Sequence, residues 1–99
     1  MRRAAKRDDN EREIIKAMEA VGCLVQQLSQ GDGVPDLLVG CPSGRLIVVE
    51  VKDGAKPKSG RKLTEKELAW HAKWARYPVF IVETIDDAVR HHDDGIPIK

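Results

Sequence analysis

Two stretches of sequence decide the fold of this chain: Gly33-Val34-Pro35-Asp36-Leu37-Leu38-Val39-Gly40 and Arg45-Leu46-Ile47-Val48-Val49-Glu50-Val51-Lys52. They are short apolar runs joined by Pro42-Ser43-Gly44, which is typical of a β-hairpin. Each run carries an acid, although carboxylates are almost never buried unless they are paired or bind a metal. The pattern therefore indicates that Asp36 and Glu50 have a function beyond packing.

We expect the two runs to form antiparallel strands over residues 36–41 and 45–51. Pairing across the turn sets Asp36 opposite Glu50. Because side chains alternate along a strand, Lys52 shares the face of Glu50. The nearly continuous apolar run of the second strand predicts burial on both of its faces, and hence a central position in the sheet.

The remaining elements follow from apolar spacing and capping residues. A helix is expected over residues 9–21, capped by Asp9 or Asn10 and stopped by Gly22. Thr64 and Glu67 form a capping box at the start of a second helix. Further strands are expected at 23–28 and 78–83, and a last helix at 85–92.

The element order is therefore α-β-β-β-α-β with a terminal helix. A helical crossover makes the third and fourth strands parallel, whereas the first three form an antiparallel meander. The predicted fold class is α/β, with a mixed four-stranded sheet flanked by helices. We expect a single domain over residues 1–99, in which the polar residues 1–8 fray.

The net charge of +1 is no indication of a nucleic-acid partner. Basic residues are concentrated, however, in the loop predicted after the third strand, where they are expected to contact DNA phosphates: Lys56, Lys58, Arg61 and Lys62. Cys23 and Cys41 have no zinc-site spacing and are expected to be small buried thiols. No apolar stretch is long enough to span a membrane, so we expect a cytoplasmic protein.

Two facing carboxylates with open coordination positions suit Mg²⁺, or Mn²⁺ as its substitute. The carbonyl of Val51 can reach the same ion. The ammonium of Lys52 can orient a water or stabilise negative charge developing on a phosphoryl group. These residue types predict hydrolysis of phosphodiester bonds.

Pro35-Asp36 followed by Glu50-Val51-Lys52, in this element order, resembles the PD-(D/E)XK nuclease superfamily. The flanking residues resemble its virus-type replication-repair nuclease (VRR-NUC) branch, in particular the stand-alone phage-type members. The resemblance extends from about Asn10 to Val89 and rests on Gly33-Val34-Pro35-Asp36, Glu50-Val51-Lys52-Asp53-Gly54 and Leu63-Thr64-x-x-Glu67-x-x-Trp70.

The resemblance implies a restriction-endonuclease-like core and a Mg²⁺-dependent DNA endonuclease. It also implies a homodimer acting on branched DNA, such as a Holliday junction, in a bacterial or phage-infected cell. By position, Asp36, Glu50 and the Val51 carbonyl would bind metal, and Lys52 would be the catalytic lysine.

Three further acids are open in this comparison. The family uses a glutamate of the first helix, for which Glu11 and Glu13 both qualify; Glu11 is preferred because Glu13 adjoins an apolar pair. Glu67 stands where the family often has glutamine, so it either joins the site or only closes the capping box. His71 is expected to pack or lie at the surface, and Trp70 and Trp74 to lie in the core or an interface.

Two other functions fit the same residues. One is a non-catalytic DNA-binding module that retains the fold. The other is a nuclease subunit that is active only with a partner such as a helicase.

Overall fold

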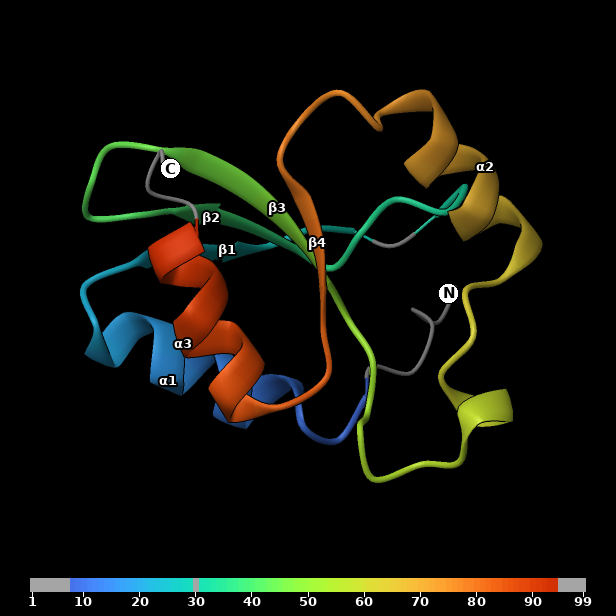
Figure 1. The fold of residues 1–99 in the computed structure, drawn as a ribbon, viewed down its shortest axis with the longest axis horizontal. Coiled ribbons are helices and arrows are strands. Elements are labelled where there is room, and N and C mark those ends of the chain that lie inside the picture. Colours follow the sequence, from blue (N-terminus) through green and yellow to red (C-terminus); the bar gives the residue numbers. More distant parts are fainter. Residues whose placement is uncertain (1–7, 30, 95–99) are drawn as a thin grey trace, which may run out of the picture.

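The computed structural model describes residues 8–29 and 31–94, with side chains up to residue 90 (Figure 1). Residues 1–7, which we expect to fray, lie outside the described residues. Four strands form one sheet in the order β1 (Leu24–Gln27), β2 (Leu37–Gly40), β3 (Leu46–Val51) and β4 (Val79–Val82). The first two pairings are antiparallel and β3 pairs with β4 in parallel, which confirms the predicted mixed sheet.

The register of the hairpin agrees with the sequence prediction. Leu37 pairs with Val49 and Leu38 with Val48. One position beyond this ladder, Asp36 lies opposite Glu50. The strands are slightly shorter than expected because Asp36 and Cys41 fall just outside the ladder of β2.

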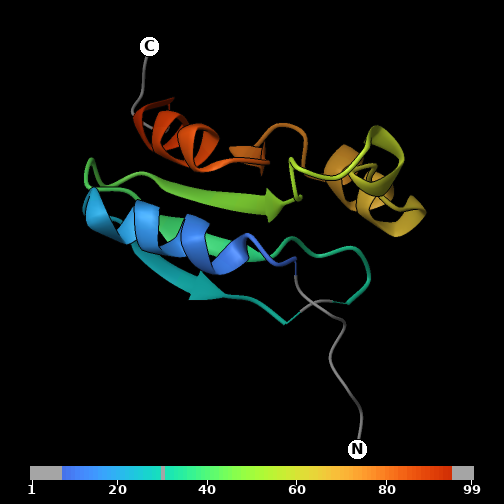
Figure 2. The ribbon, with the colours of Figure 1, turned by 90° about the horizontal axis from the view of Figure 1, so that it is seen from below.

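The helices α1 (Glu11–Ala20) and α3 (Ile85–Asp94) pack against each other and against one face of the sheet (Figure 2). Gly22 has a φ of 96°, a left-handed conformation that suits the residue following α1. The core lies between these helices and the sheet. It consists mainly of aliphatic side chains: Ile14, Met18, Leu37, Val39, Ile47, Val49, Val51, Val82 and Ala88, with both cysteines.

The helix α2 (Glu65–Lys73) begins with the predicted capping box: Thr64 Oγ1 accepts from the Glu67 N–H, and Glu67 Oε1 accepts from the Thr64 N–H. None of its residues is buried. It lies near the end of the sheet where β3 finishes, away from α1 and α3 (Figures 1 and 2). Gly33 lies so close to the first turn of α2 that a Cβ there would collide with the Lys66 carbonyl.

The opposite face of the sheet is not covered by α1 and α3. Strand alternation places Leu24, Leu38, Leu46, Val48, Val79 and Ile81 on this open sheet face. Leu24 is 79% exposed and Leu46 59%. Our prediction that β3 is buried on both faces is therefore wrong for its first half, because both α1 and α3 cover the other face.

The loop after β3 contains one element that the sequence did not predict, a short 3₁₀ helix, η1 (Lys58–Gly60). Trp70 and Trp74 stack at a centroid distance of 5.1 Å along α2, and Trp74 is 41% exposed, so they are not core residues. Among the described residues there is no helix of the length and apolar character needed to cross a membrane.

Candidate active site

Pro35 interrupts the β2–β3 ladder at the position of the predicted metal site. Even-numbered residues of β3 bond to β4, as the Val48 and Lys52 amides do, so Val51 faces β2 and would pair with residue 35. Proline has no N–H to donate to the Val51 carbonyl. The Val51 N–H is taken instead by Asp36 Oδ2, at 2.7 Å. This arrangement fixes the Asp36 carboxylate and keeps the ladder from using the Val51 carbonyl.

Glu50 is buried beside Asp36, with 2% of its surface exposed. Burial, followed by the charges of Asp36 and Glu67, raises the pKa of Glu50 to about 9. Its Oε1 is buried and has no hydrogen-bond partner among the described residues. Two such carboxylates side by side repel each other in their ionised forms, and a divalent cation between them would relieve this repulsion.

Lys52 lies two positions after Glu50, so strand alternation places it on the same face. Its Nζ lies 2.9 Å from Glu67 Oε1 and 4.0 Å from Glu50 Oε2. Burial disfavours the ammonium, but the hydrogen bond and charge of Glu67 outweigh it and raise the pKa of Lys52. Burial likewise opposes ionisation of Glu67, yet its hydrogen bonds with Lys52 and Thr64 lower the pKa of Glu67. Both groups are therefore charged at neutral pH.

Glu67 thus closes the capping box and also contacts Lys52. The same oxygen, Oε1, closes the capping box and accepts from Lys52. This contact connects the start of α2 to the end of β3. It holds the ammonium beside the two carboxylates.

His71 lies one helical turn after Glu67 and reaches the same cluster. Its Nε2 is 3.6 Å from Glu50 Oε1. Burial lowers the pKa of His71, which favours the neutral imidazole at neutral pH. Our expectation of a packing or surface role did not place this side chain against Glu50.

The cluster fits a hard divalent cation that keeps several waters. No group of three or more His, Cys, Asp or Glu side chains within residues 8–29 and 31–90 is arranged to hold a metal. The oxygens that could hold such an ion are those of the Asp36 and Glu50 carboxylates and the Val51 carbonyl. Few protein oxygens and open positions are what Mg²⁺ accepts.

Comparison with known proteins agrees with this geometry. A scan against family models and a search of curated proteins gave no match. A solved structure described as a VRR_NUC domain matches with a TM-score of 0.62 and 31% sequence identity. The match covers 82% of this chain and 91% of that one. The chain belongs to the VRR-NUC family.

The family makes this chain a nuclease domain with a restriction-endonuclease-like fold, as its residues indicate. In this VRR-NUC domain the two candidate acids of α1 differ in their surroundings. Glu13 is exposed, whereas Glu11 is 3% exposed and its Oε2 accepts from Gln27 at 2.9 Å. Glu11 therefore points toward β1, the strand that pairs with β2.

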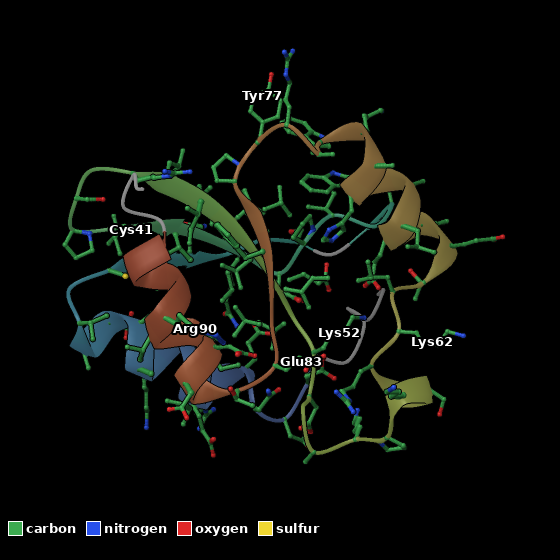
Figure 3. The ribbon with its side chains drawn as sticks, viewed as in Figure 1. Cys41, Lys52, Lys62, Tyr77, Glu83 and Arg90 are labelled. Atoms are coloured by element: carbon green, nitrogen blue, oxygen red, sulfur yellow. The ribbon has the colours of Figure 1, made fainter. Side chains whose placement is uncertain are left out.

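The basic loop of this VRR-NUC domain is partly neutralised. Lys56 lies 3.4 Å from Asp8, and Arg61 lies 3.2 Å from Glu83. Lys58 and Lys62 are exposed and form no ion pair with a described residue, and Lys62 extends away from the site (Figure 3). These two lysines are the members of the predicted set that are free to meet a phosphate.

Asn10 is a site-supporting residue whose role the sequence did not indicate. It takes the N-cap position of α1, but its side chain does not cap the helix. Its Nδ2 donates to the carbonyls of Lys52 and Glu83, each at 3.1 Å. It thus holds the ends of β3 and β4 together at the end of Glu50-Val51-Lys52. No local pattern could have indicated these two distant acceptors.

Proposed function

We propose that this VRR-NUC domain is a metal-dependent, structure-specific DNA endonuclease that acts as a homodimer on branched DNA such as a Holliday junction. The observation that supports it most is the buried Asp36–Glu50 pair with Lys52 beside it. Two carboxylates that repel each other are rarely buried unless a positive charge compensates them. A divalent cation bound between them would explain their burial.

Asp36, Glu50 and the Val51 carbonyl would hold Mg²⁺. When bound, the ion would polarise the scissile phosphate and lower the pKa of the attacking water. Lys52, kept charged and in place by Glu67, would stabilise the negative charge that develops on the phosphoryl oxygens. Lys58 and Lys62 would contact phosphates beyond the cleaved bond and so position the strand.

The open sheet face supports the homodimer. Its strand side chains are uncharged except Glu50, which is covered at the α2 end. The cation Lys52 follows Glu50 at that same end, so the rest of the face can meet its copy about a two-fold axis without charge repulsion. Burial of Leu24, Leu46 and Ile81, which are 79%, 59% and 40% exposed, would stabilise the pair.

The test uses the purified chain with a labelled four-way junction, a flap, a duplex and a single strand, in Mg²⁺ or Mn²⁺. We expect the branched substrates to be cut, and Asp36→Ala to reduce cleavage by about a thousandfold or more. Lys16→Ala, an exposed change on α1, is the matched control and should cut normally. Light scattering on the same sample should give twice the chain mass of 11.0 kDa.

Three results would contradict the proposal. Full activity of Asp36→Ala would move the chemistry elsewhere. A protein that binds junctions but has no Asp36-dependent Mn²⁺ site would be a binding module. Cleavage that appears only when a helicase-type partner is added would make the chain a dependent subunit.

A further inference from the structure

We propose that His71 is a positioning residue of this nuclease site, which fixes the metal-binding carboxylate of Glu50 by donating a hydrogen bond from Nε2 to Oε1. The inference rests on the proposed function, because it assumes that Glu50 binds the cation. It adds a residue of α2 to a site otherwise built from β2 and β3.

The first support is the pairing of two unsatisfied atoms. Among the described residues, Glu50 Oε1 and His71 Nε2 are both buried and both without a hydrogen-bond partner. They face each other at 3.6 Å. Buried polar atoms are nearly always satisfied, so two facing exceptions indicate a contact that closes when the site is loaded. At 3.6 Å the hydrogen bond is not yet made, and a small movement would complete it.

The second support is that the two oxygens of the Glu50 carboxylate face different donors. Its Oε2 faces the Lys52 ammonium at 4.0 Å, and its Oε1 faces His71. A carboxylate that binds a metal has to be held at a defined angle, and outer hydrogen bonds supply that constraint. With one donor for each oxygen, Glu50 would be held in a single orientation beside Asp36.

The surroundings hold the imidazole in place. The ring of Trp70 meets that of His71 edge-on, with centroids 5.7 Å apart and an interplanar angle of 71°. The close contact of Gly33 with the first turn of α2 fixes the helix over the site. The Glu67–Lys52 ion pair ties the preceding turn to β3. His71 is thus placed beside Glu50 by a helix that contacts Gly33 and Lys52.

Direct coordination by His71 is the competing role, and it needs the opposite tautomer. A ligand presents a bare Nε2 to the metal, whereas a donor carries its hydrogen there. The Nε2 atom of His71 faces Glu50 Oε1 at 3.6 Å, a separation that a hydrogen bond can close, so the geometry favours the donor role. The two roles predict different spectra for bound Mn²⁺.

The experiment measures Mn²⁺ affinity by titration calorimetry for the wild type, His71→Gln and His71→Leu. The amide nitrogen of glutamine lies near the place of Nε2 and can donate, whereas leucine cannot. We expect His71→Leu to weaken Mn²⁺ binding by about 10- to 100-fold, and His71→Gln to stay within about threefold of the wild type. Lys73→Leu, an exposed change on the same helix, is the matched control and should bind normally.

Cleavage kinetics should agree: His71→Leu should lower kcat while leaving KM for the junction unchanged. If leucine disturbs folding, His71→Asn replaces it, because the shorter amide cannot reach Oε1. Wild-type affinity in His71→Leu, or an equal loss in leucine and glutamine variants, overturns the inference. So does a nitrogen coupling in the pulsed electron-spin spectrum of bound Mn²⁺, which would make His71 a ligand. Failure of the wild type itself to bind Mn²⁺ would instead overturn the proposed function.

Discussion

The two ends of strand β2 bury polar pairs of very different character. At one end Asp36 lies opposite Glu50; at the other, one position beyond the Leu24–Gly40 pair, Cys41 lies opposite Cys23. Burial is the largest cause of the raised pKa at both ends: to about 9 for Glu50 and to about 11 for Cys23. Burial also raises the pKa of Cys41.

The same physics has opposite consequences at the two ends. Thiols are neutral at pH 7, so raising their pKa costs nothing and the cysteines pack as small apolar groups. Carboxylates in water are ionised at pH 7, so burying them is unfavourable unless they take up a proton or bind a cation. The difference fits a structural role for the cysteine end and the proposed metal site at the carboxylate end. Three substitutions test this difference between the two ends of β2.

The largest effect is expected from Lys52→Met, which removes the ammonium from the carboxylate end. Because Lys52 would stabilise transition-state charge, cleavage should fall by about 10²- to 10³-fold, which exceeds any loss of Mn²⁺ affinity from the looser Glu50 carboxylate. Single-turnover cleavage and calorimetry measure the two quantities. Lys16→Met is the control. If Lys52→Met lost metal binding as completely as Asp36→Ala, the lysine would be a structural counter-ion instead.

The next effect is on stability: most core mutations destabilise a protein, whereas this one is expected to stabilise it. The folded pKa of Glu50 lies above the ordinary value of 4.5, so its stabilising contribution is complete below pH 4.5 and is lost as pH rises toward 9. Glu50→Gln should therefore stabilise the metal-free protein by about 1–3 kcal/mol at pH 8, and by much less at pH 5. Urea unfolding at the two pH values, with EDTA, measures this. Equal stability at pH 8 would mean that the Glu50 carboxyl is not strained.

The smallest effects are expected at the cysteine end. Cys41→Ala should cost about 1 kcal/mol of unfolding free energy, through lost packing, and leave cleavage unchanged. Because the pKa of Cys23 is about 11, few thiolates exist at pH 8, and the folded protein should react slowly with a thiol reagent. The reaction should become fast in urea. A thiol that reacts quickly in the native state would contradict the burial argument.

Local patterns were sufficient for much of this molecule. The turn at Pro42-Ser43-Gly44 fixed the register that opposes Asp36 and Glu50, and the Thr64–Glu67 capping box marked the start of α2. Both depend on residues close together in the chain. The facing of Asp36 and Glu50 could therefore be predicted before any fold was known.

What the sequence could not predict depends on how distant elements dock. The packing of α1 and α3 on one face leaves the other face open, although all residues of β3 except Glu50 are apolar. The position of His71 follows from the seating of α2 on Gly33, a contact between segments far apart in the sequence. Asn10 bonds to the carbonyls of two strands that no helix-capping rule connects to it.

The absence of any buried residue in α2 divides the site into two parts that differ in local stability. Asp36 and Glu50 belong to the core and open only with the whole domain. Glu67 and His71 belong to a helix held by polar contacts and one glycine, so its amides should exchange with deuterium well before those of β3. One half of the site should then be as stable as the core, whereas the other half should open at a lower free energy while the fold stays intact.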